Sequence, residues 1–209
     1  TDEDMQDLTW DEYLALGEKL KEKGHMLQTY NPNDIAEFQI MLQSTGKWFT
    51  DNDGNADFTN NDALKECYDV FKKLNESDFC QVVSDWTGFA GAINNGDVAC
   101  VMRGSWITST IMGADDQSGK WKMAPIPKMS TDSATHYSNQ GGSSWFVLKN
   151  SKNADAAAKF LADTFGGSTE LYDSLMKSNN IIGTYLPAAD IEAVNTESEF
   201  FSGQQINKT

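Results

Sequence analysis

The sequence predicts a helix-rich α/β domain with a small mixed sheet. Several segments carry apolar residues at helical spacing, and each begins at a capping residue or ends at glycine. Short runs rich in β-branched and aromatic residues lie between these segments. The chain shows neither an internal repeat nor a low-complexity tract. Its 209 residues are enough to bury a substantial core.

The beginning of the chain alternates helices and short strands. Thr9 and Glu12 have the spacing of a capping box, so we expect a helix that starts there and ends at Gly24. A short strand is expected over residues 26–30. A second helix is expected over residues 35–43.

The middle of the chain predicts a hairpin, a helix and a segment that ends in an exposed tryptophan. Residues 47–58 predict a small hairpin around a turn rich in Asn and Asp. Asn60 is expected to cap the strongly amphipathic helix that follows. Residues 86–106 predict a further helix, a strand over 98–102, and a Gly-Ser-Trp turn that presents Trp106.

The second half predicts two more strands and three helices. Residues 121–127 predict an edge strand, because the two prolines in this run cannot donate to a ladder. Residues 145–148 predict a buried strand. Asn153 is expected to cap a helix, and further helices are expected over 170–177 and 188–193.

Composition excludes several classes of partner. The net charge of −15 is spread along the chain and repels phosphate backbones and anionic lipids, so we expect no nucleic acid and no direct membrane insertion. No apolar stretch has the length that spans a bilayer. The first residues, Thr-Asp-Glu-Asp, do not resemble a natural start, so we expect an excised fragment.

The cysteines and histidines point away from metal and catalytic chemistry. The odd count of cysteines and the lack of CxxC spacing argue against a disulfide framework or a zinc site. We expect free thiols, with a Cys67–Cys80 bridge as the alternative. His25 and His136 are the only histidines, and neither lies beside Ser or Cys in a recognisable motif. Carboxylates are numerous, so their number alone does not exclude a glycosidase-like catalytic pair, but no pair lies in a sequence context that singles it out. We therefore expect a binding protein without a cofactor, and no enzyme.

Five groups of residues occur in a fixed order along the chain and resemble known motifs. They are a TWDEY helix start (9–13), Phe-Thr-Asn before a helix (58–60), AINNGDVA followed by GSW (92–106), QGG with its downstream WFVL, SKN and AAAKF (140–160), and LPA (186–188). Together they resemble the C-terminal lobe of family 1 extracellular solute-binding proteins of ABC importers, the group that includes maltose-binding protein. Residues 100–103 depart mildly from the Met-rich strand that is commoner in that family.

The resemblance implies a periplasmic binding protein type II-like fold whose two lobes close around a ligand. Residues 1–209 would form one C-terminal lobe, and the N-terminal lobe and the last helices would be absent. The implied partners are a sugar or oligosaccharide, the permease subunits of an ABC transporter, and the missing N-terminal lobe. The implied location is extracellular or periplasmic, with a lipid anchor on the full-length protein.

The resemblance also indicates ligand-binding tryptophans. Trp106 is the tryptophan of the Gly-Ser-Trp motif, and an indole plane can bury the apolar face of a sugar. Trp86 follows Asp85 where maltose-binding protein has an aspartate–tyrosine pair. The alternative for each tryptophan is ordinary packing against its own segment.

Two polar groups complete the ligand-binding set. Gln140, Gly141 and Gly142 can bring an amide and backbone N–H groups close to ligand hydroxyls, or can form a turn before a strand. Asn33 and Asp34 fall where the family places ligand contacts, and an N-cap role is the alternative.

An acidic loop partly resembles an EF-hand, with possible calcium ligands at Asp51, Asp53, Asn55, Asp57 and Asp62. Ala56 stands where that loop needs glycine, and Asp62 is too short for the usual bidentate contact. A hairpin turn explains the same residues. This loop defines the rival function, a secreted acidic calcium-binding or adhesion module.

Overall fold

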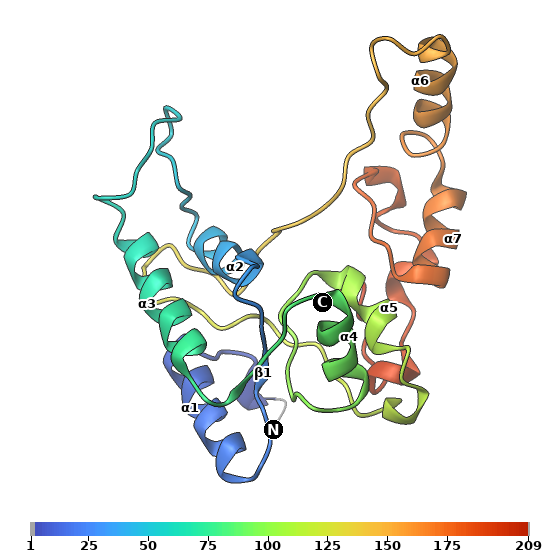
Figure 1. Cartoon of the computed structure of the whole chain (residues 1–209). Coiled ribbons are helices and arrows are strands. Elements are labelled where there is room, and N and C mark those ends of the chain that lie inside the picture. The colour runs from blue at the N-terminus through green and yellow to red at the C-terminus, as the bar shows by residue number, and fades with distance from the viewer. Residues whose placement is uncertain (1–2, 209) are drawn as a thin grey trace. The chain divides into compact units, whose positions relative to one another are not determined.

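A computed structural model describes residues 3–208, and the chain divides into two compact units (Figure 1). The first unit extends to Gly104 and includes Ala124–Gln140, and the second contains Ser105–Met123 and the chain from Gly141 onward. The predicted helix-rich α/β class is confirmed. No helix within residues 3–208 combines the length and apolar character needed to cross a membrane.

The first helix forms as its capping residues predict. Helix α1 (Trp10–Glu22) begins at Thr9, whose hydroxyl accepts a hydrogen bond from the Glu12 amide at 3.3 Å. In return, the Glu12 carboxylate accepts from the Thr9 amide at 2.8 Å, which completes the capping box. The helix ends before Gly24, which has a φ of 81°.

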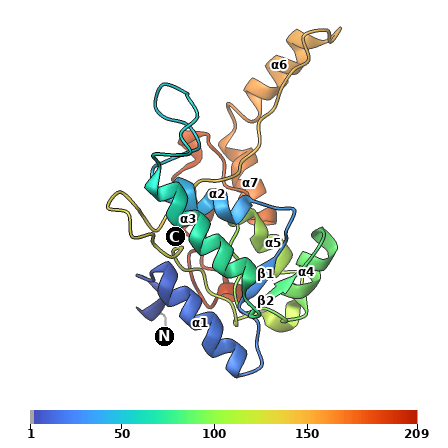
Figure 2. The same ribbon diagram turned by 60° about the vertical axis from the view of Figure 1, so that its left-hand side comes forward.

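The sheet is a pair of parallel strands at the centre of the first unit. Strands β1 (Gln28–Tyr30) and β2 (Cys80–Val82) lie side by side (Figure 2). The strand expected over 98–102 is wrong: Val98 forms only an isolated parallel bridge with Met26. Since this segment meets just the two residues that precede the strand proper, it gains too few ladder bonds. Antiparallel pairing within residues 3–208 is limited to isolated bridges, one of which closes the turn expected around residues 47–58.

Three more helices surround this pair: α2 (Ala36–Ser44), α3 (Asp62–Glu76) and α4 (Trp86–Asn94). Helix α3 lies alongside both α1 and α2 (Figure 1). The apolar faces of α1, α2 and α3 bury one core with β1, and its fully buried members include Leu27, Met41, Leu42, Cys67 and Leu74.

The cap of α3 lies one residue later than expected. Asn61, and not Asn60, accepts the hydrogen bond from the Leu64 amide at 3.0 Å. The Asn61 side chain also donates to the Trp48 carbonyl at 2.9 Å. This second contact buries Asn61 and selects it over its neighbour.

The second unit is built from α5 (Thr108–Ile111), α6 (Ala154–Asp163), α7 (Thr169–Asn179) and short 3₁₀ turns. Its buried apolar residues are Ile107, Ile111, Ala114, Tyr172, Met176, Ala188, Ala193, Phe200, Phe201 and Ile206. The helix expected over 188–193 is wrong, because that region forms two 3₁₀ turns, Leu186–Ala188 and Glu192–Asn195.

Two predicted strands do not form. Residues 121–127 form no ladder. The Ile126 amide donates to the His136 carbonyl, and the Met123 amide donates to Gln204 Oε1 at 2.7 Å. Residues 145–148 are neither buried nor paired with a strand, and Phe146 is 84% exposed. Helix α6 flanks this run, and the Phe165 ring lies 5.1 Å from the Trp145 ring between centroids, but most of the run's apolar surface is exposed.

An exposed apolar face therefore stands in the second unit, and we define it as Trp145, Phe146, Leu148 and Phe160. A groove of about 270 Å³ runs between residues 145–148 and α6. Helix α6 has an apolar stripe but buries none of its residues within this unit. Contiguous exposed apolar surface of this kind marks an interface in most folded proteins.

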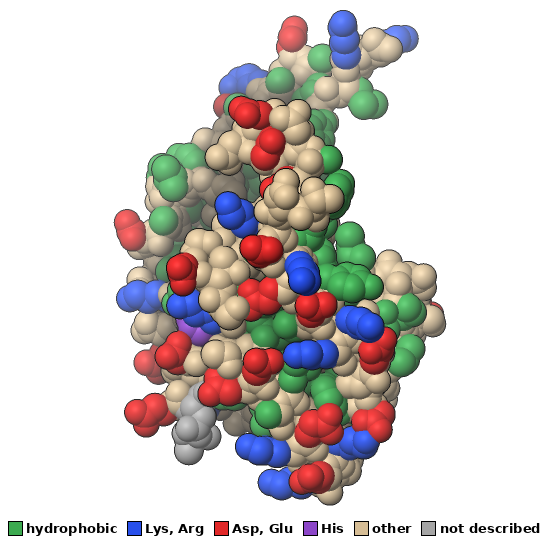
Figure 3. All heavy atoms as spheres, turned by 90° about the vertical axis from the view of Figure 1, so that its left-hand side faces the viewer, with side chains coloured by type: hydrophobic (Ala, Val, Ile, Leu, Met, Phe, Trp, Pro, Cys, Tyr) green, Lys and Arg blue, Asp and Glu red, His purple; other side chains and the backbone are tan. Residues whose placement is uncertain are grey.

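Charge is distributed over the face of the first unit that carries α1 and α3. Acidic and basic side chains alternate across it (Figure 3). Several ion pairs join neighbours there, including Lys73 with Asp11 at 3.6 Å. Such exposed pairs contribute little to stability, so this surface serves mainly solvation.

Gly17 in α1 offers a test of the core. A Cβ atom at this position would lie 2.5 Å from Cδ2 of the buried Phe79 ring. We expect Gly17→Ala to lower the free energy of unfolding by about 1–3 kcal/mol, because the overlap outweighs the gain in helix propensity. Urea denaturation measures the change.

Gly91 in α4 is the matched control, since a Cβ atom there would meet nothing within 4 Å. We expect Gly91→Ala to be neutral or to stabilise by up to about 1 kcal/mol. Equal changes in the two variants would contradict the close packing of α1 on Phe79.

Candidate functional site

The ligand-binding residues predicted from the sequence fall into two sets. Asn33, Asp34, Trp86 and Gln140 belong to the first unit. Trp106, Gly141 and Gly142 belong to the second unit. Each set is described within its own unit.

The loop before α2 is shaped by short polar contacts. The Asn31 side chain accepts from the Asn33 amide at 2.9 Å, and the Asn31 carbonyl accepts from the Asp34 amide at 3.1 Å. Asp34 accepts from the Ala36 amide at 2.8 Å through Oδ1, although the N-cap position of α2 itself is Ile35. The Asp34 side chain nevertheless stays 40% exposed. Asn33 is exposed as well.

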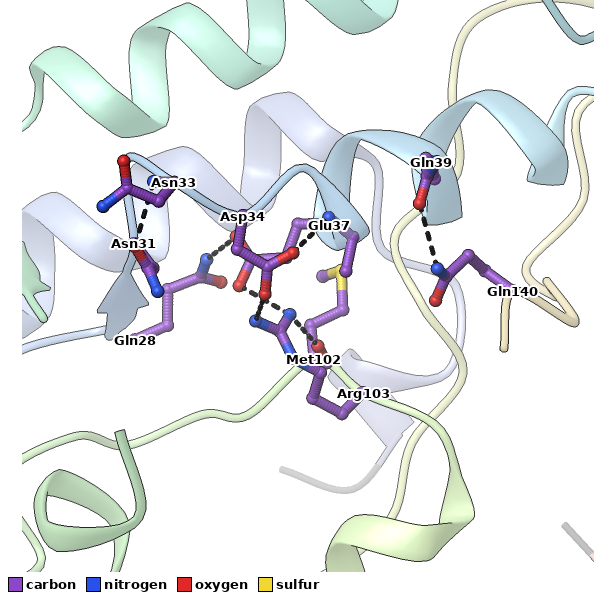
Figure 4. A network of polar contacts seen from close by, with 10 residues as sticks. Gln28, Asn31, Asn33, Asp34, Glu37, Gln39, Met102, Arg103 and Gln140 are labelled. Atoms are coloured by element: carbon purple, nitrogen blue, oxygen red, sulfur yellow. Dashed lines mark hydrogen bonds and ion pairs between the residues drawn. The ribbon is translucent and has the colours of Figure 1, made fainter. Parts of the chain in front are cut away.

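Arg103 joins this loop to the core (Figure 4). Its Nη2 donates to Asp34 Oδ2 at 3.0 Å, and its Nη1 donates to Glu37 Oε1 at 3.0 Å. Nη1 also donates to the Met102 carbonyl at 2.9 Å. The Arg103 side chain is only 10% exposed. One guanidinium thus bridges two carboxylates, a geometry that Lys cannot reproduce.

The network continues inward from Glu37. Its second oxygen, Oε2, accepts from Gln28 Nε2 at 3.0 Å. Gln28 Oε1 in turn accepts from the Tyr13 hydroxyl at 2.7 Å. Since Gln28 and Glu37 are both buried, the chain of hydrogen bonds reaches from the loop surface into the core.

Glu37 titrates far from the usual range of a carboxyl group. Burial raises the pKa of Glu37 from 4.5 to about 7, and the nearby Arg103 charge only partly opposes this rise. The charge of Asp34 also raises the pKa of Glu37, by a smaller amount. The other ionisable groups around Glu37 are the Tyr13 phenol and the Cys80 thiol, and burial raises the pKa of both.

An aromatic pair lies beside the same guanidinium. Arg103 sits over the Phe89 ring of α4, with 5.0 Å from Cζ to the ring centroid. The Trp86 ring lies 5.4 Å from the Phe89 ring, and Trp86 is 53% exposed. Asp85 caps α4 by accepting from the Gly88 amide at 2.9 Å, which fixes the turn that presents Trp86.

Gln140 reaches the same part of the first unit through α2. Its Nε2 donates to Gln39 Oε1 at 3.0 Å. Asp34 precedes this helix and Gln39 lies within it (Figure 4). The structure therefore brings Asn33, Asp34 and Gln140 to one helix, and links Asp34 to the Trp86–Phe89 pair through Arg103.

The second unit carries the remaining predicted residues. Trp106 lies in the 3₁₀ turn Ser105–Ile107 and is 46% exposed. Gly141 and Gly142 have φ angles of 121° and 89°, which only glycine adopts readily. Both glycines are exposed, so their backbone groups can be approached closely.

The acidic loop behaves as a turn. Asp51 Oδ1 accepts from the Asp53 and Asn55 amides at 2.9 Å and 2.8 Å. In residues 3–208 no three His, Cys, Asp or Glu side chains gather as metal ligands, so the Asp51, Asp53, Asn55, Asp57 and Asp62 set is not assembled. The expectation of free thiols is confirmed for Cys67, Cys80 and Cys100.

Sequence reasoning missed Arg103 and Glu37. Arg103 is the only arginine in the sequence, and it ends an otherwise apolar run, which could have singled it out. Glu37 lies among apolar residues of a helix and gives no local sign of its burial. Their contact spans 66 positions in the sequence, so only the fold reveals it.

The raised pKa of Glu37 makes stability depend on pH. The folded chain holds the Glu37 proton up to about pH 7, whereas the unfolded chain releases it near pH 4.5. Stability from this group is therefore complete below about pH 4.5 and is lost as pH rises through 7. Glu37→Gln keeps the shape without the titration, so we expect it to gain stability relative to wild type between pH 5 and pH 7.5.

Urea denaturation of both proteins across this range measures the difference, which we expect to reach a few kcal/mol at most. The control is Glu76→Gln, which alters an exposed ion pair with Lys72 that should contribute little to stability. A pH-independent difference for Glu37→Gln would contradict the shifted titration.

The chain matches known proteins along nearly its whole length. The profile of the bacterial extracellular solute-binding protein family matches residues 2–201. The lactose-binding protein of Rhizobium radiobacter is 37% identical over 205 residues, which are 98% of this chain and 49% of that protein. The chain thus spans about half the length of this curated relative.

A solved structure shows the same fold. It is the ABC transporter associated binding protein from B. animalis subsp. lactis Bl-04 in complex with beta-1,6-galactobiose. The match has a TM-score of 0.78 at 20% identity and covers 96% of this chain and 52% of that one. On the family match and the agreement of fold, this chain belongs to the bacterial extracellular solute-binding proteins, a family of binding proteins and not of enzymes.

Proposed function

We propose that this chain is the C-terminal lobe of a carbohydrate-binding protein that delivers its ligand to an ABC import permease. The observation that carries the proposal is the 37% identity to a lactose-binding protein across 98% of the chain. The shared fold with a binding protein in complex with beta-1,6-galactobiose supports it. One relative is named for lactose and the other is in complex with beta-1,6-galactobiose, so a β-galactoside is the ligand class that we test first.

The first unit has side chains that suit a sugar. The half-exposed Trp86 indole offers a flat apolar surface for the C–H face of a pyranose. The exposed oxygen surface of Asp34 can accept hydrogen bonds from hydroxyl groups. Asn33 and Gln140 add amide groups around α2. An apolar plane with a few fixed polar groups is the usual composition of a small-molecule site.

The second unit supplies the other aromatic and two exposed glycines. Trp106 presents a second half-exposed indole. Gly141 and Gly142 are exposed, and nothing lies within 4 Å of the place where a side chain would begin, so a ligand can approach their backbone closely. We assign these three residues of the second unit to ligand binding.

The rest of the ligand cleft comes from another lobe. The chain spans 49% and 52% of its two relatives, so about half of such a protein lies outside it. The exposed apolar face of Trp145, Phe146, Leu148 and Phe160 is a suitable place for that lobe to pack. The longer protein would act outside the cell, as its family does, and we expect a lipid anchor to hold it at the cell surface.

Ligand binding is tested first by thermal shift. We expect lactose or β-1,6-galactobiose to raise the melting temperature of the longer protein, because a ligand that binds only the folded state stabilises it. Maltose and a dipeptide serve as comparison ligands. A shift with the dipeptide and none with any sugar would refute the carbohydrate assignment.

The chain alone should behave differently. A single lobe cannot close around a ligand, so we expect weak or undetectable binding of the same sugars by residues 1–209. Isothermal calorimetry measures this directly. Nanomolar affinity of the isolated chain for a sugar would show that the second lobe is dispensable.

The two exposed indoles give a site-specific test in the longer protein. We expect Trp86→Ala and Trp106→Ala each to weaken sugar binding by about tenfold or more, since buried aromatic anchors dominate binding energy. Trp48→Ala is the control, because Trp48 is also exposed and its ring contacts Phe49, at 4.9 Å between ring centroids. Equal losses in all three variants would argue against stacking at Trp86 and Trp106.

A further inference from the structure

Asp34 is held at both of its oxygens and yet remains exposed. Oδ1 accepts from the Ala36 amide, and Oδ2 accepts from Arg103 Nη2. A short acidic side chain on a loop is ordinarily free to change rotamer. Here the two contacts fix the carboxylate, so it is oriented before any ligand arrives.

Arg103 is itself fixed from the core side. Glu37 Oε1 and the Met102 carbonyl both accept from Nη1, and the Phe89 ring lies under the guanidinium. Glu37 is held in turn by Gln28. The position of Asp34 is therefore set by buried groups of β1, α2 and α4, and the loop alone does not determine it.

Arg103 is poorly suited to touch a ligand itself. Its side chain is 10% exposed, and both hydrogens of Nη1 are used by protein acceptors. Asp34, at 40%, is the part of the cluster that solvent reaches. Arg103 is thus the buried member of this pair, and the Asp34 carboxylate is the accessible one.

We propose that Arg103, held by Glu37, is a positioning residue that orients Asp34 for ligand binding. This role rests on the proposed function, since Asp34 is assigned there to a sugar hydroxyl. Arg103 fixes the Asp34 carboxylate before the ligand arrives. This raises the affinity for ligand, because a fixed acceptor loses less conformational entropy on binding. The fork of the guanidinium matters, since one ammonium group cannot hold both carboxylates in this geometry.

A double-mutant cycle on the longer protein tests the proposal, with lactose and β-1,6-galactobiose as probes. Arg103→Lys keeps the charge beside Glu37, and Asp34→Asn keeps an acceptor for the Ala36 amide. We expect Arg103→Lys to weaken binding by about tenfold in the wild-type background and by no more than about twofold in the Asp34→Asn background. A general structural role would give the same loss in both backgrounds, and that result would overturn the proposal.

Amide hydrogen exchange supplies a readout that needs no ligand. We expect Arg103→Lys to speed exchange at the Asn33 and Ala36 amides, which donate within this loop. Lys72→Gln, which alters an exposed ion pair of α3, should leave both amides unchanged. Unchanged exchange in Arg103→Lys would also overturn the proposal, even where Asp34→Asn binds too weakly to measure.

The two readouts separate this inference from the proposed function. If the wild-type protein binds neither sugar, the carbohydrate assignment fails, while exchange at Asn33 and Ala36 still reports on positioning. If the wild-type protein binds and Arg103→Lys binds equally well, the sugar assignment stands and the role of Arg103 fails.

Discussion

The first unit depends on a buried guanidinium that is shared by two carboxylates. Removing such charges from water costs several kcal/mol per ion, and only complete hydrogen bonding offsets that cost. The structure meets this condition at each carboxylate, because Gln28 occupies the second oxygen of Glu37 and the Ala36 amide occupies that of Asp34. A partly formed cluster would be worse than an apolar one, so the segments that carry these groups have one favourable arrangement.

Local signals in the sequence were sufficient where the structure is local. The capping box at Thr9 and Glu12 needs only residues three positions apart, and α1 begins there. Strands need distant partners, and here prediction was only partly right. The strand expected over 26–30 forms as β1, but residues 98–102 find only a bridge to Met26, and 145–148 find no neighbouring strand among the described residues. Asn60 and Asn61 are indistinguishable as caps until the Trp48 carbonyl selects one of them.

In the candidate site, too, sequence-based prediction found residues that belong to local motifs and missed residues that depend on distant contacts. The resemblance to binding proteins indicated Asp34 as a candidate, and the structure adds that its carboxylate accepts from the Ala36 amide and from Arg103. Trp86 could have packed away from solvent, but it is 53% exposed beside Phe89, and its role in ligand binding stays a prediction. Glu37 and Arg103 were invisible because neither has a motif and their contact joins distant segments. Arg103 is the one arginine in a sequence with many lysines, and this is the feature of the sequence that singles it out.

The extended run at residues 145–148 has a consequence for handling the isolated chain. Its sequence, Trp-Phe-Val-Leu, is uncharged, free of proline and rich in residues that favour β structure. With Phe146 almost fully exposed and no strand beside it among the residues described, it is a template for pairing with the same run of another molecule. The isolated chain therefore carries its own aggregation-prone segment, despite a net charge of −15 that favours solubility.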